Sequence, residues 1–182
     1  MDNGASSYRR YLNGDEDAFG EIVKEYFDKL VFFLQRYVHN WAEAEELALD
    51  VFAQLVADKH RYDFRVSLKT YLFMLGRSRA VDHLRRKKMI PFLELSEAEQ
   101  MEDPGQTPEE LVLQEARKQA VDRALENLEP MQRLAVHLVY FEQLSCDEAA
   151  KVLKKSRKQV YNLLYRAKNN LRALLGEESE LF

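Results

Sequence analysis

Residues 145–175 read SCDEAAKVLKKSRKQVYNLLYRAKNNLRALL, and this stretch decides the fold. Ser145, followed three positions later by Glu148, forms a capping box that predicts a helix over residues 146–153. Ser156 and Gln159 form a second capping box, which predicts a longer helix over residues 157–175. Only residues 154–156 separate the two helices, and so short a connection forces the sharp turn of a helix-turn-helix motif.

The predicted last helix has an apolar inward face and a polar outer face. Arginine and lysine at the start of such a helix can donate to guanine in the major groove, and asparagine and glutamine can pair with adenine. We therefore expect the outer face and its cap to contact duplex DNA, through Ser156, Arg157, Lys158, Gln159, Tyr161, Asn162, Tyr165, Arg166 and Lys168. The competing interpretation is a solvated amphipathic hairpin whose basic face only keeps the protein soluble.

One position departs from the usual motif. Glycine is typical at the turn, and Lys154 stands there instead. Lysine is tolerated at such a position, at some strain, if its φ stays negative or the turn is lengthened.

Charge is sorted along the chain although its total is small. The 182 residues carry 27 Lys and Arg against 31 Asp and Glu, a net charge of −4. By segment, the net charge is +5 over residues 77–88, −8 over 94–115 and +8 over 151–172. A solvated surface usually mixes signs, so two basic blocks flanking an acidic one indicate two surfaces for a polyanion.

Composition excludes several classes of protein. The single Cys146 leaves no intrachain disulfide or cysteine-based zinc site and fits a reducing compartment, so we expect a cytoplasmic protein. The polar, acidic residues 1–17 resemble no signal peptide, and no apolar run is long enough for membrane insertion. The four histidines are scattered, without a paired nucleophile or acid. We therefore expect no enzyme activity, no metal and no cofactor.

Helical periodicity runs through the rest of the chain. It predicts helices over residues 19–38, 41–56, 67–88, 107–127 and 130–141, and no strand pattern competes. Scarce glycine and proline (6 and 4 residues) agree with an all-α fold. Pro91, Pro104 and Gly105 lie among acids and predict a flexible acidic linker. We expect two small helical domains, over residues 1–88 and 108–182, joined by residues 89–107.

Two features of the first domain point to binding. Aromatic and basic residues alternate in a loop over residues 58–67, a combination that holds single-stranded nucleic acid by base stacking and phosphate contacts. The simpler interpretation, favoured for this loop alone, is that Tyr62 and Phe64 plug the core. On the second helix, Glu46 and Asp50 lie four positions apart on one face, where like charges favour a basic partner surface.

Taken together, these segments resemble the extracytoplasmic-function (ECF) group of bacterial RNA polymerase sigma factors. Residues 42–52, AEAEELALDVF, are similar to the region 2 segment that contacts the polymerase clamp helices. Residues 67–73, SLKTYLF, and 80–86, AVDHLRR, are similar to the segment that opens and reads the −10 element. Residues 145–150 and 160–168 match the region 4 motif that reads the −35 element.

The resemblance implies a promoter-specificity subunit without catalysis, whose partners are core RNA polymerase and promoter DNA. It implies a polymerase-binding set of Glu43, Glu45, Glu46 and Asp50. It implies a −10 set of Tyr62, Phe64, Arg65, Lys69, Tyr71, Arg77, Arg79, Arg85 and Arg86. The nine residues of the last helix and its cap would read the −35 element, and the linker would thread the RNA exit channel.

The chain also departs from the family pattern. Leu49-Asp50 replaces the usual Gln-Glu, Tyr71 the usual tryptophan, and Gly76 lies mid-helix where alanine is common. Residues 161–163 also differ, so promoter preference is not transferable. Many relatives are held by an anti-sigma factor, but no segment here decides whether such a partner exists. Two other functions stay open: a stand-alone helix-turn-helix regulator, and a helical adaptor that does not bind DNA.

Overall fold

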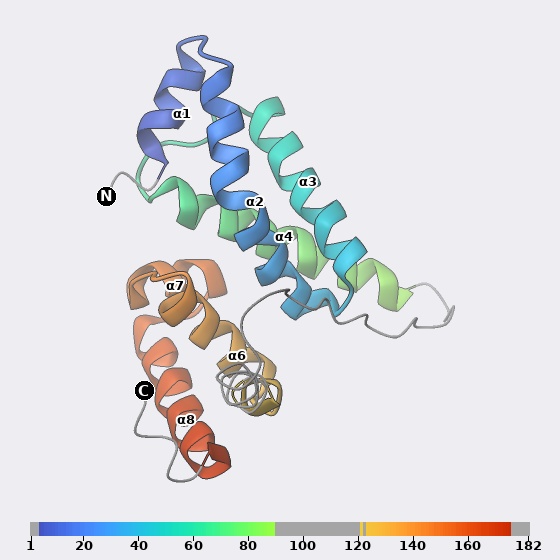
Figure 1. Ribbon diagram of the computed structural model, residues 1–182, viewed down its shortest axis with the longest axis vertical. Coiled ribbons are helices and arrows are strands. Elements are labelled where there is room, and N and C mark those ends of the chain that lie inside the picture. The colour runs from blue at the N-terminus through green and yellow to red at the C-terminus, as the bar shows by residue number, and fades with distance from the viewer. Residues whose placement is uncertain (1–3, 90–120, 122, 176–182) are drawn as a thin grey trace, which may run out of the picture.

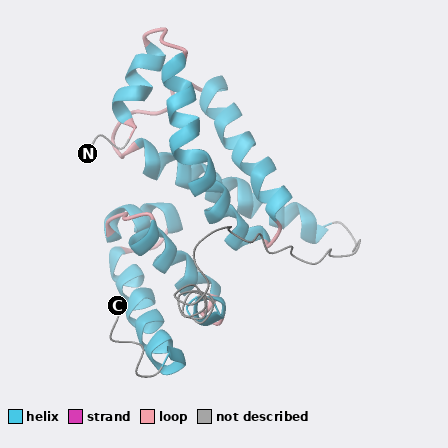
Figure 2. Cartoon of the chain, viewed as in Figure 1, coloured by secondary structure: helices cyan, strands magenta, loops and turns pink. Residues whose placement is uncertain are grey.

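The computed structural model describes residues 4–89, 121 and 123–175, and no strand occurs among them. This confirms the predicted all-α fold (Figure 2). The helices are α1 (Ala5–Leu12), α2 (Asp17–Val38), α3 (Trp41–Ala57), α4 (Leu68–Met89), α6 (Pro130–Val136), η1 (His137–Phe141), α7 (Cys146–Leu153) and α8 (Arg157–Leu175). The predicted linker and most of the helix expected over residues 107–127 lie outside the described residues.

Helices α2, α3 and α4 pack against one another in the first half of the chain (Figure 1). Their apolar faces bury Ile22, Leu30, Ala48 and Leu72. Asn40 caps α3 by accepting a hydrogen bond from the backbone nitrogen of Glu43 at 3.0 Å, which explains why the helix begins at Trp41.

Helix α1 was not predicted from the sequence. It packs along α2, and its Tyr8 is fully buried. The Tyr8 hydroxyl donates to the backbone oxygen of Lys59 at 2.7 Å, so a contact with a residue 51 positions away fixes the helix. Its eight residues are too short a helix to be stable without such tertiary contacts.

Gly76 allows α2 and α4 to approach each other closely. A Cβ atom at this position would lie 2.8 Å from Leu30 Cδ1 and 3.5 Å from Leu34 Cδ2. Glycine lowers helix propensity by about 1 kcal/mol relative to alanine. Here it also leaves room for two buried leucines, which explains its place in the middle of α4.

The second half consists of α6, η1, α7 and α8. Pro130 occupies the first position of α6, as its fixed φ favours. The chain then continues as the π-helix η1, in place of the last turns of the single α-helix predicted over residues 130–141. Both predicted capping boxes are present, at Ser145–Glu148 and at Ser156–Gln159.

Helix α7 ends in a Schellman motif, which begins the turn to α8. The backbone nitrogen of Lys155 donates to Ala150 O at 3.0 Å, and that of Lys154 donates to Lys151 O at 3.3 Å. Lys154 has φ +51°, which is left-handed. The expectation of a negative φ or a longer turn is therefore wrong, because the helix end needs the backbone conformation that glycine adopts most easily.

The two halves contact each other through α4 and α7, and through α2 and α6 (Figure 1). Buried apolar residues run without interruption from the first half into the second, from Tyr8 to Val160. This contact places the start of α4 against the start of α7.

Candidate nucleic-acid and polymerase interface

The outer face of α8 is open to solvent. All nine residues expected to contact duplex DNA are exposed: Ser156, Arg157, Lys158, Gln159, Tyr161, Asn162, Tyr165, Arg166 and Lys168. They are exposed because α8 buries only the opposite face, through Val160 and Ala167. The outer face of α8 therefore presents basic residues and no acidic side chain of its own.

The start of α8 is held rigid by its cap. The backbone nitrogen of Ser156 donates to Gln159 Oε1 at 2.8 Å, and the backbone nitrogen of Gln159 donates to Ser156 Oγ at 3.2 Å. The side-chain oxygens of these two residues therefore accept hydrogen bonds from the helix backbone. The amide nitrogen of Gln159 can still donate hydrogen bonds to a ligand.

Arg157 is positioned by two neighbours. Its guanidinium lies 5.5 Å from the ring centroid of Tyr161 and donates to the Tyr161 hydroxyl at 3.3 Å. A further ion pair, at 3.4 Å, links it to Asp147 on α7. The hydrogen bond to Tyr161 and then the charge of Asp147 raise the pKa of Arg157. These contacts orient the arginine along the helix without burying it.

A hollow of about 260 Å³, lined by both polar and apolar side chains, lies beside the start of α8. Its lining includes Gln159, Asn162 and Arg166 of α8, together with Lys155 of the turn and Met131 of α6. Lys155 is not one of the nine residues expected to contact duplex DNA. The structure places it with three of the residues expected to read bases.

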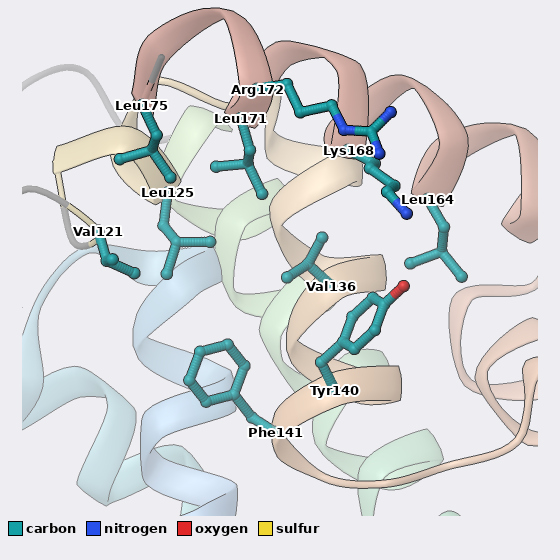
Figure 3. A pocket seen from close by; sticks show the side chains of 10 residues that line it. All are labelled: Val121, Leu125, Val136, Tyr140, Phe141, Leu164, Lys168, Leu171, Arg172 and Leu175. Atoms are coloured by element: carbon teal, nitrogen blue, oxygen red, sulfur yellow. The ribbon is translucent and has the colours of Figure 1, made fainter. Parts of the chain in front are cut away.

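A second, apolar cavity of about 290 Å³ lies further along α8 (Figure 3). Leu164 and Leu171 line it from α8, and Val136 and Phe141 line it from α6 and η1. Lys168 and Arg172 also line this cavity and lie close together in Figure 3. Lys168 is therefore exposed, as expected, but it also borders an apolar cavity well away from the helix start.

In the loop before α4, Tyr62 lies in the core, as the simpler interpretation of this loop predicted, and not on the −10 surface that the resemblance implied. Its side chain is only 3% exposed and its hydroxyl donates to Val66 O at 2.6 Å. The ring packs against Tyr8, Phe64 and Tyr71 at centroid distances of 5.3, 4.6 and 5.1 Å. Tyr62 plugs the core in this conformation and presents no face to a base.

Phe64 and Arg65 remain closer to solvent. Phe64 is partly buried, has φ +60°, and lies under the Arg9 guanidinium at 4.9 Å from its ring centroid. A positive φ is unusual for a bulky residue, so packing on Tyr8 and Tyr62 must hold this loop in place. Arg65 is exposed beside Asp63, at 3.2 Å.

The arginines of α4 differ in what they contact. Arg79 donates twice to Gln54 Oε1 of α3, at 3.2 and 2.9 Å, so its guanidinium is committed to packing α3 against α4. Arg77 and Tyr71 are partly buried. Arg85, 3.6 Å from Asp82, and Arg86 are exposed and provide positive charge near the C-terminal end of the helix.

Lys69 is not on the open surface. Its ammonium lies 2.8 Å from Glu142 Oε2, and the two side chains are only 14% and 7% exposed. The sequence placed Lys69 on the −10 surface, but in this arrangement a carboxylate from the second half of the chain covers it.

The acidic residues of α3 form two groups. Glu45, Glu46 and Asp50 are exposed, as a partner surface requires. Glu43 instead accepts hydrogen bonds from Lys87 at 2.6 Å and His83 at 2.8 Å. Partial burial opposes its ionisation, but the bonds from Lys87 and His83 outweigh that cost and lower the pKa of Glu43.

Sequence reasoning missed apolar residues on this same face. Leu49 is 59% exposed between Glu46 and Asp50, and Val56 is also exposed further along α3. Glu45, Glu46, Leu49 and Asp50 are called the α3 surface below. The signal was present in the sequence, as the leucine that stands where relatives carry glutamine.

Within the ranges that the structure describes, no cluster of three or more potential ligands suits a metal ion. None of the helices in those ranges is both long and apolar enough to cross a membrane.

Two family models match the chain. The model of sigma-70 region 2 matches residues 22–89, and the model of sigma-70 region 4 matches residues 118–171. The ECF RNA polymerase sigma factor SigW of Bacillus subtilis (strain 168) is 26% identical over 177 residues, which span 93% of this chain and 95% of that protein. SigX of the same organism is 27% identical over 170 residues, 90% of this chain and 88% of that protein.

Solved structures agree on the fold. The sigma factor RpoE of Bartonella quintana, solved with the anti-sigma factor NepR, has a TM-score of 0.66 at 22% identity, covering 87% of this chain and 97% of that chain. CnrH, solved with the cytosolic domain of CnrY, has a TM-score of 0.62 at 22% identity, covering 95% and 94%. The chain therefore carries the two regions of a sigma-70-type factor. It belongs to the ECF sigma factors and directs transcription initiation.

Proposed function

We propose that residues 1–88 and 108–182 act as separate promoter-binding units of one sigma factor, joined by the linker over residues 89–107. The second unit would place the start of α8 in the −35 major groove. The observation that carries this proposal is the exposed outer face of α8, because residues 151–172 hold eight basic residues and no acidic one. Such a surface supplies phosphate contacts, and its Asn162 and Arg166 supply base contacts.

The first unit would bind core polymerase through the α3 surface. Three exposed acids there favour a basic partner, and the exposed Leu49 adds apolar contact area at the centre. Glu43 would have a different role from the one the sequence implied, since its carboxylate holds α3 to α4 through Lys87 and His83.

The −10 element would lie along α4 and the loop before it. The residues that remain candidates for this contact in the described arrangement are Phe64, Arg65, Tyr71, Arg77 and the exposed arginines Arg85 and Arg86. Single-stranded DNA needs both aromatic faces and positive charge, and this surface offers both.

The proposal includes four further properties of this chain. RpoE of Bartonella quintana was solved with an anti-sigma factor, and we propose a partner of that class here. The protein would act in the cytoplasm and catalyse no reaction itself. The acids of the linker lie outside the described residues; we propose that they mimic nucleic acid in the RNA exit channel. Their replacement by serine should then alter initiation or escape from the promoter.

Reconstitution with core RNA polymerase tests the proposal. The chain is added to core enzyme, and transcription is measured on a library of random promoter templates. We expect enrichment of templates that share two short elements. The charge reversal Arg157→Glu/Lys158→Glu should abolish selection of the upstream element while core binding persists.

Three results would contradict the proposal. Absence of core binding would overturn it outright. Tight, specific duplex binding by the isolated chain, without polymerase, would support a stand-alone regulator. Unchanged transcription by the charge-reversed variant would support an adaptor that does not use DNA.

A further inference from the structure

The apolar cavity along α8 exposes aromatic rings to solvent. Leu171 and Leu175 line this cavity of about 290 Å³ from α8 (Figure 3). Tyr140 and Phe141 line it from η1, and their side chains are 65% and 57% exposed. Exposed aromatic rings beside an apolar cavity indicate a surface that another apolar group covers.

Two positive charges stand beside these rings. Lys168 and Arg172 line the same cavity, are exposed and lie close together (Figure 3). They are four positions apart on α8, where like charges repel each other. Neither forms an ion pair with a residue that the structure describes. The cavity therefore fits an occupant that carries negative charge next to an apolar part.

The chain itself contains a segment of that chemistry. Residues 176–182 read GEESELF and lie outside the described residues. They combine three acids with two large apolar residues and no base: Glu177, Glu178, Glu180, Leu181 and Phe182. We propose that this segment, called the tail below, turns back along α8 and covers the cavity, with its acids facing the two cations and its apolar pair against the exposed rings.

The tail is long enough to cross the cavity. Its first residue directly follows Leu175, which lines the cavity, and Leu164 lines it eleven positions earlier. That separation is about 17 Å along a helix axis, and seven extended residues span about 23 Å. Gly176 stands immediately after the last residue of α8, where glycine lets a chain reverse its direction.

The covalent link to α8 makes weak contacts sufficient. Because the tail is joined to Leu175, its effective concentration at the cavity is on the order of millimolar. Exposed ion pairs add little attraction, so burial of the two apolar side chains must supply most of it. The ion pairs set the direction in which the tail lies and distinguish it from other apolar segments.

Tryptophan fluorescence in the full chain tests the proposal. Trp41 is the only tryptophan, so Trp41→Phe leaves a chain into which a single reporter can be placed. Tyr140→Trp reports on the cavity. Tyr165→Trp is the matched control, because Tyr165 is 69% exposed on the outer face of α8 and does not line the cavity. Quenching by acrylamide measures how freely solvent reaches each reporter.

We expect the tail to shield the reporter at position 140 and not the one at position 165. A chain that ends at Leu175 should roughly double the quenching constant of Tyr140→Trp, because both faces of the ring become accessible, and should leave that of Tyr165→Trp unchanged. The reversal Glu177→Lys/Glu178→Lys/Glu180→Lys should have the same effect without shortening the chain. Addition of Lys168→Glu/Arg172→Glu to that variant should restore the shielding, because the charges are then complementary again.

Equal quenching at position 140 with and without the tail, in folded chains, would overturn the proposal and leave the cavity to another ligand. Shielding that survives the reversal of the three acids would refute the role given to Lys168 and Arg172. Shielding that weakens on dilution would place the tail in a second copy of the chain and would overturn the intrachain contact. None of these results depends on promoter or polymerase binding, so each leaves the proposed function untouched.

Discussion

The carboxylate of Glu43 lies 2.6 Å from the ammonium of Lys87, across the contact between α3 and α4. His83 approaches the other carboxylate oxygen at 2.8 Å. Glu46, on the same helix, is exposed and makes no ion pair with a described residue. Two glutamates that look equivalent in the sequence thus have separate roles, one in joining helices and one in presenting charge.

Replacement of Glu43 should therefore affect stability, and replacement of Glu46 should affect binding. Because hydrogen bonds to charged groups are stronger than neutral ones, Glu43→Gln should lower the free energy of unfolding by about 1 kcal/mol at pH 7. Glu46→Gln should change it by less than about 0.5 kcal/mol. Urea unfolding measures both, and titration with core polymerase should show weaker binding for Glu46→Gln.

The pH dependence of the Glu43 contribution follows from its lowered pKa. The folded state favours the ionised carboxylate, so this stability is present above the ordinary value of 4.5 and is lost as the pH falls below it. The difference in unfolding free energy between the natural chain and Glu43→Gln should shrink between pH 5 and pH 3. A constant difference over that range would contradict the assignment.

His137 should make the contact between the halves sensitive to acid. Its ring stacks on Phe33 of α2 and on Phe141, at centroid distances of 6.1 and 5.8 Å. Burial, and then the charges of Arg36 and Lys69, lower the pKa of His137 from 6.5 to about 3. Glu142, 3.6 Å away, does not reverse this shift, because its carboxylate is already paired with Lys69.

The folded state therefore favours neutral His137, while the unfolded chain takes up a proton near pH 6.5. Stability should fall as the pH drops from 6.5 towards 3, by at most about 1.4 kcal/mol per pH unit from this group. His137→Phe should remove that slope, since phenylalanine can fill the space between two rings. The same slope in His137→Phe, or its loss in the exposed control His60→Gln, would refute the assignment.

The residues that sequence reasoning placed correctly are those whose position is set locally. Capping boxes and apolar periodicity lie within a few residues of one another, so α7 and α8 begin and end where the pattern predicts. Lys69 was misplaced because a distant contact decides its environment. Glu142 is 73 positions from Lys69, and no local pattern indicates that the two will meet.

The strained backbone at Phe64 and the π-helix η1 are two further features that no local pattern in the sequence indicates. No glycine or proline in the sequence marks either feature. The left-handed Phe64 is held by rings from α1 and from its own loop. The π-helix precedes Glu142, which pairs with Lys69 of α4. Local propensity favoured an ordinary helix there, and tertiary packing overrode it.

Asn162 and Lys155 should have different effects on promoter binding. Both line the hollow at the start of α8. Asn162→Ala should relax preference at one base position of the upstream element, at a cost of about 1–3 kcal/mol on the preferred sequence. Lys155→Ala should weaken binding to all sequences alike and reduce the salt dependence by about one ion. Competition binding by the holoenzyme over a range of salt concentrations separates these two outcomes. An equal loss of affinity on every sequence for Asn162→Ala would contradict a base contact by Asn162.

Lys154 offers a gain in stability. Its φ of +51° is left-handed, which costs a residue with a Cβ atom about 1–2 kcal/mol, and glycine adopts it without that cost. Glycine also has more conformational freedom to lose on folding, so Lys154→Gly should raise the free energy of unfolding by about 1 kcal/mol.

Lys154→Ala removes the same charge but keeps the strain, and it should give no comparable gain. Lys155→Gly adds a glycine one position later, where φ is not positive, and should not stabilise the protein. Urea unfolding of the three variants at one pH and salt concentration measures the effect. An equal rise for Lys154→Gly and Lys154→Ala would assign the gain to relief of charge repulsion within the basic turn, and the backbone explanation would then fail.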